Sequence, residues 1–252
     1  MNGMDVIGRT RRWLALLLAV LLSGPLLTLA FGSASLHGDW SRATHRSVGL
    51  APDPAMHREA IVQVYAGRTF GWRGAFAVHT WVAAKPADAD RYTRYEVIGW
   101  YARGGGSGLT VSDSRAPDAE WYGATPRLIA DVRGAEAEAV LAKLPQVADA
   151  YPHTTYKAWP GPNSNTFVAY LGRAIPELRL TMPPLAVGKD YLPISQVVAP
   201  TPSGTGYQLS LGGVLGVSLA RDEGLELNLF GLVAGVDFRH PAVKIPGIGS
   251  IP

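Results

Sequence analysis

Three side chains in the chain are of the types that carry out covalent acyl transfer. His79 lies in an apolar run, Glu96 lies in the alternating run that follows, and Ser164 begins a later segment with helical periodicity. A serine hydroxyl attacks a carbonyl when a histidine takes its proton and a carboxylate orients the imidazole. Free N–H groups at a helix N-terminus stabilise the oxyanion that forms. The sequence therefore predicts Ser164 as nucleophile, His79 as general base and Glu96 as orienting group.

Four further residues are candidates for substrate binding. Asn163 and Asn165 flank the serine, and we expect them beside the oxyanion position. Trp81 and Trp159 are large aromatic residues that could line a substrate groove. Each candidate has a structural alternative, because Asn and Ser are favoured at helix N-caps and large aromatic residues commonly pack in cores. His79 could likewise be a core histidine that donates to a main-chain carbonyl.

Two strands and a helix must position these residues. Residues 75–83 are β-branched and aromatic and predict a buried strand, and residues 91–101 alternate and predict its antiparallel partner. Apolar residues at i, i+4 and i+8 predict a helix that begins near residue 163 or 164 and ends at Pro176. The other predicted elements are strands over 61–65 and 127–132, a helix over 135–144, and two apolar strands within 207–238 that form a C-terminal β-hairpin. Together they predict an α+β fold.

An apolar segment near the N-terminus predicts a membrane anchor. Residues 13–31 are nineteen residues without a charge, long enough to span a hydrocarbon core of about 30 Å. Arg9, Arg11 and Arg12 precede the segment, and basic flanks stay in the cytoplasm. We therefore expect a single-pass inner-membrane protein with the bulk of the chain in the periplasm. A cleaved signal peptide is the alternative, since residues 33–35 are small, but the length of the segment favours the anchor.

The chain is predicted to have four parts. Residues 1–12 are the cytoplasmic N-terminus, residues 13–31 the transmembrane anchor or signal segment, residues 32–56 a linker, and residues 57–252 one extracytoplasmic domain.

Composition excludes several classes of site. The folded part is nearly neutral and has no run of Lys or Arg, so nucleic acid is not an expected partner. The chain has no cysteine, which removes disulfides, thiolate metal sites and cysteine nucleophiles. Its six histidines include no i, i+4 pair that would place two ligands on one helix face. We therefore expect no metal site and no cofactor.

The order of the candidate residues resembles the circularly permuted branch of the NlpC/P60 papain-like superfamily, which includes lecithin:retinol acyltransferase-like and YiiX-like proteins. The matching segments are residues 78–80, 95–97 and 163–167. The resemblance implies a papain-like antiparallel sheet with a helix that carries the nucleophile. The position of Ser164 is normally cysteine in that superfamily. A hydroxyl is less readily ionised than a thiol, so the site needs re-tuning or is inactive.

The body of the chain more closely resembles DUF3750, a bacterial family of membrane-associated proteins without an assigned activity. The segments that carry this resemblance are GPNSNTF at residues 161–167 and GKDY at residues 188–191. The likeness covers most of residues 50–252 and implies a membrane-associated protein.

Three functions are consistent with the sequence. The leading hypothesis is a cell-envelope hydrolase or acyltransferase that acts on an amide or ester, in a peptidoglycan peptide or a lipid acyl group. The alternative is a catalytically inactive, membrane-anchored module that binds an envelope ligand. A third is a structural partner of another membrane protein, with the apolar residues 207–238 as its docking surface.

Overall fold

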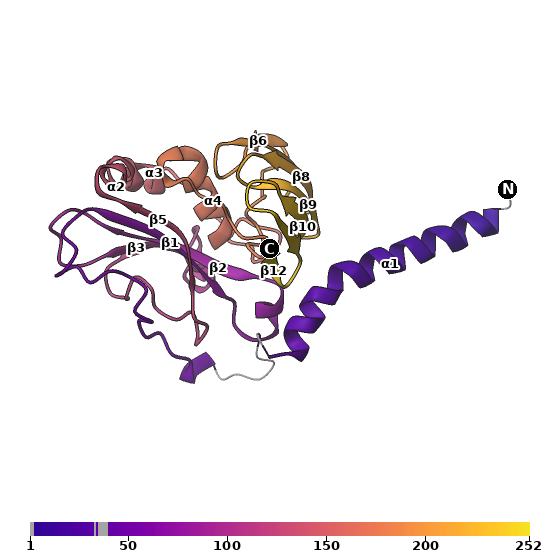
Figure 1. Cartoon of the computed structure of the whole chain (residues 1–252), viewed down its shortest axis with the longest axis horizontal. Coiled ribbons are helices and arrows are strands. Elements are labelled where there is room, and N and C mark those ends of the chain that lie inside the picture. Colours follow the sequence, from indigo (N-terminus) through magenta and orange to yellow (C-terminus); the bar gives the residue numbers. More distant parts are fainter. Residues whose placement is uncertain (1–2, 33, 35–39) are drawn as a thin grey trace.

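The computed structural model describes residues 3–32, 34 and 40–252 and contains two antiparallel sheets with helices between and beside them (Figure 1). One sheet has five strands in the order β4-β3-β2-β1-β5, and the other has seven in the order β12-β11-β10-β9-β8-β7-β6. The predicted α+β class is confirmed. Residues 33 and 35–39, which include most of the candidate cleavage site and part of the predicted linker, lie outside the described residues, as do residues 1–2.

The five-stranded sheet holds the strands that the sequence pattern predicts. Its strands are β1 (Ile61–Arg68), β2 (Val78–Lys85), β3 (Thr93–Val97), β4 (Leu109–Ser112) and β5 (Arg127–Arg133). The predicted pairing of the second and third runs is confirmed as the antiparallel β2–β3 ladder. β2 is buried along its whole length. Because both of its faces are covered, it reads as a continuous apolar run and does not alternate.

Helices cover one face of this sheet. They are α2 (Gly134–Leu141), α3 (Leu144–Asp149) and α4 (Ser164–Ala174). Val64, Val82 and Phe167 lie in the core between sheet and helices. The structure has two helices, α2 and α3, where the sequence pattern predicts one helix over 135–144. Pro145 lies in the first turn of α3, a position where its missing N–H breaks no helical hydrogen bond. The predicted helix from Ser164 is confirmed as α4.

Loops cover the opposite face of the five-stranded sheet over a second, aromatic core. The segment before β1 crosses this face and forms a bridge between Ser47 and Ala119. The Asp118 carboxylate accepts hydrogen bonds from the Ser47 hydroxyl and the N–H groups of Leu50 and Ala51. The described part of the predicted linker is therefore packed on the domain. The described residues also form four short 3₁₀ helices: η1 (Trp40–Arg42), η2 (Gly71–Ala75), η3 (Gly99–Gly104) and η4 (Pro176–Leu178). The last of them, η4, packs against α2 and α4 on the helical side of the sheet.

The C-terminal region is a seven-stranded meander, so the prediction of a two-stranded hairpin is wrong. Its strands are β6 (Val198–Pro200), β7 (Gly206–Leu211), β8 (Leu215–Ala220), β9 (Gly224–Leu229), β10 (Leu232–Asp237), β11 (Ala242–Ile245) and β12 (Gly249–Ile251). Four of them, β7 to β10, fall almost entirely within residues 207–238. The sequence pattern hides the turns because they are short and partly apolar. The β9–β10 turn consists of Phe230 and Gly231, both at positive φ, as a tight hairpin turn requires.

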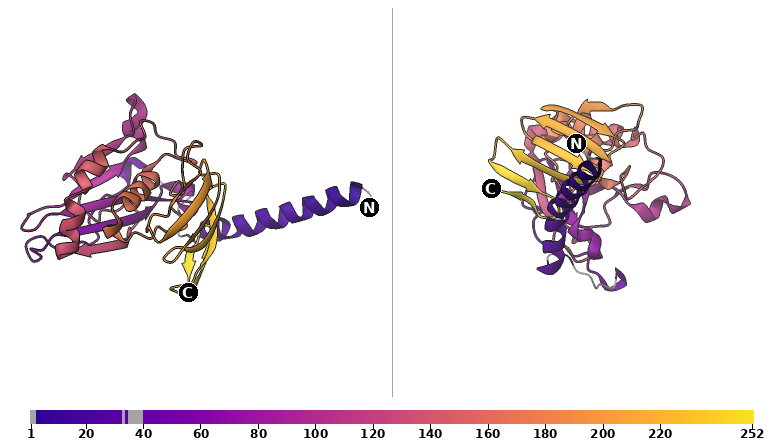
Figure 2. Two further views of the ribbon diagram at one scale, coloured as in Figure 1. Left: turned by 90° about the horizontal axis from the view of Figure 1, so that it is seen from above. Right: turned by 90° about the vertical axis from the view of Figure 1, so that its right-hand side faces the viewer.

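The N-terminal helix α1 (Gly3–Ala30) projects from the body on the side of the seven-stranded sheet (Figure 2). Its stretch Arg9–Ala30 is long and apolar enough to cross a membrane. The last turns of α1 contact the β11–β12 turn, where the Thr28 hydroxyl donates to the Gly247 carbonyl at 3.0 Å. The helix is therefore fixed at its base to the C-terminal sheet.

Candidate functional site

His79, Glu96 and Arg94 form a buried polar network on the five-stranded sheet. The Nε2 atom of His79 lies 3.0 Å from Oε2 of Glu96, and Nη2 of Arg94 donates to the same oxygen at 2.9 Å. Arg94 and Glu96 are two residues apart on β3 and so point to one face. Each of the three residues is at most 5% exposed. The structure thus brings together the predicted base and the predicted orienting residue.

The charges within this network are set by burial and by its own contacts. Burial raises the pKa of Glu96, but the hydrogen bond with His79 and the charge of Arg94 outweigh it and hold that pKa at about 2. Burial lowers the pKa of His79, and Glu96 opposes this only in part. At neutral pH the network therefore contains a carboxylate, a guanidinium and a neutral imidazole whose Nε2–H donates to the carboxylate.

Aromatic rings enclose the imidazole. The ring of His79 stacks on Trp121 with centroids 3.6 Å apart, and Trp81 lies beside it at 5.7 Å. Gly67 pairs with His79 across β1 and β2, and a Cβ at Gly67 would lie 2.9 Å from the Trp121 Cβ. Trp81 is fully buried, receives the Arg94 guanidinium on its ring face at 4.4 Å, and donates through Nε1 to the Pro117 carbonyl. Trp81 thus packs in the core beneath the loops.

Ser164 lies on the other face of the sheet. The residue next to His79 on β2 is Thr80, whose hydroxyl donates to Asn165 Oδ1 at 2.9 Å and to the Ser164 carbonyl at 3.5 Å. Successive side chains of a strand point to opposite faces. Because Thr80 points toward α4, His79 points away from it. The sheet therefore separates the imidazole from the serine that begins α4.

Asn163 and Asn165 fasten the start of α4 to its surroundings. The Asn163 side chain accepts from the N–H groups of Asn165 and Thr166, and the Thr166 hydroxyl accepts from the Asn163 N–H, which completes a capping box. The amide of Asn165 donates to the carbonyls of Val78 and Val187. Asn163 also donates to Val187. Both asparagine side chains are thus bound to the main chain in this structure.

Trp159 belongs to a different part of the molecule from Trp81. It is 51% exposed, and its Nε1 donates to the carbonyl of Phe230 in the β9–β10 turn at 2.9 Å. This contact joins the loop before α4 to the seven-stranded sheet.

A polar cleft adjoins the His79 network and was not among the predicted sites. The cleft has a volume of about 420 Å³ and is lined by residues 47, 51–54, 91–92 and 113–118. Arg91 and Asp113 form an ion pair at 3.1 Å. Nη1 of Arg115 is buried without a hydrogen-bond partner among the described residues. The signal for this site in the sequence is the polar segment DSRAPD at residues 113–118, which contains no catalytic motif.

The floor of the cleft is tied to the buried network. Nη1 of Arg94 donates to the Ala116 carbonyl at 3.1 Å, and Trp81 donates to Pro117. The network therefore fixes the loop that carries Arg115 and Asp118.

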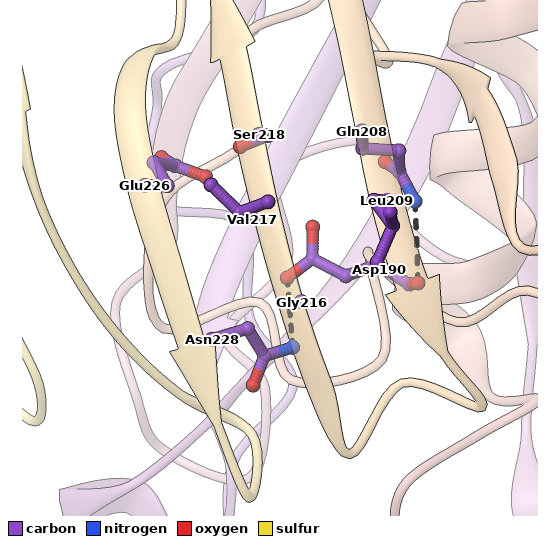
Figure 3. Close-up of a pocket in the computed structure, with 8 residues that line it drawn as sticks. All are labelled: Asp190, Gln208, Leu209, Gly216, Val217, Ser218, Glu226 and Asn228. Carbon is purple, nitrogen blue, oxygen red and sulfur yellow. Dashed lines mark hydrogen bonds between the residues drawn. The ribbon is translucent and has the colours of Figure 1, made fainter.

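A second buried ionic cluster lies behind the seven-stranded sheet. Lys189 contacts Asp190 and Glu226, and Lys244 donates to the other oxygen of Glu226. Burial raises the pKa of Glu226, but the charges of Lys189 and Lys244 outweigh it and lower that pKa overall. Figure 3 shows Asp190 hydrogen-bonded to Gln208 and to Asn228 on this face. The cavity among them has a volume of about 10 Å³, room for a single water, so the cluster is structural.

In the described part of the chain, no three His, Asp or Glu side chains are placed to hold a metal ion.

Comparison with known proteins identifies the family. No curated protein and no solved structure matches the chain, so the papain-like resemblance stays a prediction. The family model DUF3750, described as a protein of unknown function, matches residues 59–191, which include the five-stranded sheet, the helices beside it and the His79 network. Since the match covers more than half of the sequence, the chain belongs to the DUF3750 family.

Proposed function

We propose that this protein is a membrane-anchored envelope module that binds a ligand in its polar cleft and does not catalyse acyl transfer. The observation that carries the proposal is the position of His79 and Ser164 on opposite faces of the five-stranded sheet. A general base must lie within hydrogen-bond reach of the hydroxyl, or within reach through one water. β2 is paired on both sides, with β1 and β3, so a change of rotamer does not carry the imidazole through the sheet.

The cleft supports binding of a ligand with both signs of charge. Arg91 and Arg115 offer guanidinium groups for carboxylates, and Asp113 offers a carboxylate for an ammonium group. Arg115 lines the cleft, and its buried Nη1 has no hydrogen-bond partner among the described residues, which is costly for a buried donor. A peptide with free carboxylate and amino groups, such as the stem peptide of peptidoglycan, has this chemistry.

The N-terminal helix supports anchoring and orientation. Its stretch Arg9–Ala30 has the length and apolar character of a membrane span. Arg9, Arg11 and Arg12 lie at the outer end of α1, and such basic residues remain on the cytoplasmic side. This arrangement supports a periplasmic position for the cleft.

Co-sedimentation of the detergent-solubilised full chain with purified peptidoglycan sacculi tests the proposal. We expect the wild-type chain to sediment with the sacculi, and Arg91→Glu to weaken binding at least fivefold because it repels carboxylates and breaks the pair with Asp113. Arg58→Glu is the matched control. Arg58 is exposed, pairs loosely with Asp88 at 3.9 Å and lies outside the cleft. The proposal that the cleft binds a peptide is contradicted if Arg91→Glu and Arg58→Glu bind the sacculi equally well. It is also contradicted if neither the wild-type chain nor a variant binds them.

A hydrolase is the second candidate, and the contact between His79 and Glu96 is the observation in its favour. Its test is labelling of the full chain with a serine-directed fluorophosphonate. Under our proposal Ser164 stays unlabelled, and Ser164→Ala leaves binding to sacculi unchanged. Specific labelling of Ser164, with hydrolysis of an envelope amide or ester that Ser164→Ala abolishes, would overturn the non-catalytic proposal.

A further inference from the structure

The seven-stranded sheet is amphipathic in the opposite sense to a sheet on the surface of a soluble protein. On β7 the side chains of Tyr207, Leu209 and Leu211 are exposed, whereas Gln208 and Ser210 between them are buried. β9 repeats the pattern, with Leu227 exposed between buried Glu226 and Asn228. Antiparallel sheets normally direct apolar residues to the core and polar residues to water. Here the polar residues face the body of the protein.

The strand register shows that this apolar surface is continuous. Residues paired directly across antiparallel strands share a face, and Leu209 pairs with Val198 and Val217, while Val217 pairs with Leu227. The same ladder continues through β10 to β12. We call this surface the outer apolar face. It consists of Val198, Pro200, Tyr207, Leu209, Leu211, Leu215, Val217, Leu219, Leu225, Leu227, Leu229, Leu232, Ala234, Val236, Val243, Ile245 and Ile251.

The outer apolar face contains no charged residue and remains largely open to solvent. Leu219 and Leu227 are 62% and 51% exposed. An apolar surface of this extent, spread over every strand of the sheet, marks a contact with another apolar body. The buried cluster of Lys189, Glu226 and Lys244 behind the sheet holds the polar face against the domain. If the sheet turned its leucines inward, Glu226 would turn outward and the buried ion pair of Lys189 with Glu226 would be lost.

The contacts of α1 with the C-terminal sheet bear on the nature of this apolar body. Gly24 and Thr28 contact the β11–β12 turn: a Cβ at Gly24 would lie 1.9 Å from the Pro246 carbonyl oxygen, and Thr28 donates to Gly247. Both residues lie inside the apolar stretch Arg9–Ala30. At 1.5 Å per residue, Gly24 is only about 9 Å from the end of that stretch. When the stretch spans a bilayer, the β11–β12 turn lies within about 9 Å of the bilayer surface.

The orientation of the sheet and a nearby aromatic residue agree with this placement. Figure 2 shows that α1 extends on the side of the seven-stranded sheet that faces away from the five-stranded sheet. The helix η2 contacts the base of α1 and carries Trp72, which is 52% exposed. Tryptophan is enriched where proteins meet the interface between lipid and water.

We propose that the outer apolar face lies on the surface of the bilayer that α1 crosses, so that the domain is held flat on the membrane by a helix and a sheet together. The proposal rests on membrane anchoring by α1, as proposed above. The seven-stranded sheet lies outside the residues matched by the family model. The proposal gives this sheet a lipid-binding function that is separate from the cleft.

The lack of cysteine in the chain makes a direct test possible. Single cysteines replace Leu219 or Leu227 on the outer apolar face, Val20 in α1, or Ser114 in the cleft, and each is labelled with nitrobenzoxadiazole. The full chains are reconstituted in vesicles of phosphatidylethanolamine and phosphatidylglycerol that contain a nitroxide-labelled lipid. We expect strong quenching at positions 219, 227 and 20, and little at position 114.

The four labels separate the possible failures. Quenching at position 20 without quenching at positions 219 and 227 overturns the contact between sheet and lipid and leaves the anchor intact. Loss of quenching at all three positions overturns the anchor as well. If positions 219 and 227 are shielded from aqueous iodide but are not quenched by the nitroxide lipid, a second copy or another protein covers the face, and the lipid proposal is wrong.

Discussion

At the scale of single residues, the His79 network explains how a carboxylate, a guanidinium and an imidazole share a buried site. Glu96 accepts from both His79 and Arg94, so its negative charge is balanced by Arg94 and its oxygen is hydrogen-bonded. Removal of one partner of a buried ion pair leaves an uncompensated charge, which costs several kcal/mol. The network therefore stabilises the domain only while Glu96 is ionised.

The substitution Glu96→Gln tests this dependence on ionisation. The pKa of Glu96 falls from 4.5 to about 2 on folding, so the unfolded chain binds the proton more readily. The contribution of Glu96 is complete above pH 4.5 and is lost as the pH falls toward 2. We expect Glu96→Gln to lower the free energy of unfolding by roughly 3 kcal/mol at pH 7, and by clearly less at pH 3, as measured by urea titration of tryptophan fluorescence in detergent.

Glu136→Gln is the control for that measurement. Glu136 pairs with Arg179 at 2.7 Å, but both side chains are more than half exposed, and such surface pairs contribute about 0–1 kcal/mol. An equal loss of stability for Glu96→Gln at pH 3 and pH 7 would show that shape, and not charge, matters at position 96.

The residues of the predicted site show which contacts can be predicted from the sequence and which cannot. The pairing of β2 with β3 was predictable from the two runs, and with it the meeting of His79 and Glu96. The face of β2 that carries His79 was not predictable, because β2 is buried on both sides and has no alternation to distinguish them. An offset of one residue along β2 decides which side chain faces Ser164: Thr80 faces α4, and His79 does not.

At the scale of elements, the start of α4 depends on its cap and not on a nucleophile. Asn163→Ala removes the acceptor for two helix N–H groups and the donor to Val187. We expect it to destabilise the domain by about 2 kcal/mol. Ser164→Ala changes the next residue, for which only the main-chain carbonyl is bound among the described contacts, and we expect a change below about 0.5 kcal/mol. Thermal unfolding of the two variants in parallel measures the difference, and similar losses would contradict this assignment.

The same elements explain which parts of the fold the sequence predicts. Helix α4 was predictable because its cap, its apolar spacing and Pro176 agree on one element. The C-terminal sheet was not, because its turns at residues 212–214 and 230–231 carry Gly and apolar residues that blend into the strands. Its alternation is clear, yet alternation alone does not state which face meets water.

At the scale of the whole molecule, the arrangement of polar and apolar surfaces links the anchor to the cleft. The seven-stranded sheet is polar toward the five-stranded domain and apolar away from it, and α1 leaves from its edge (Figure 1). The polar cleft lies on the five-stranded domain, among the loops that cover its aromatic core. With the outer apolar face on lipid, the protein presents a fixed binding surface at a set height above the membrane.

The contact between α1 and the β11–β12 turn couples the membrane anchor to the domain that carries the cleft. The substitution Gly24→Val tests this contact. A side chain at Gly24 meets the Pro246 carbonyl oxygen at 1.9 Å, so the helix or the turn must move, which costs about 1–3 kcal/mol. We expect a lower melting temperature in detergent. A nitrobenzoxadiazole label at Ile251→Cys should also be quenched less by nitroxide lipid, because the sheet edge no longer stays beside the anchor.

Ser23→Val is the matched control, since it places the same side chain one position away on an exposed side of α1. It should leave both the melting temperature and the quenching at position 251 unchanged. If Gly24→Val behaves like Ser23→Val, then α1 does not pack on the turn in the membrane, and the height of the domain above the bilayer is set by the outer apolar face alone. In that case the cleft would still keep its orientation, because the sheet is tied to the domain through Lys189 and Arg173. Loss of both the α1 contact and the contact of the outer apolar face with lipid would leave the cleft free to rotate.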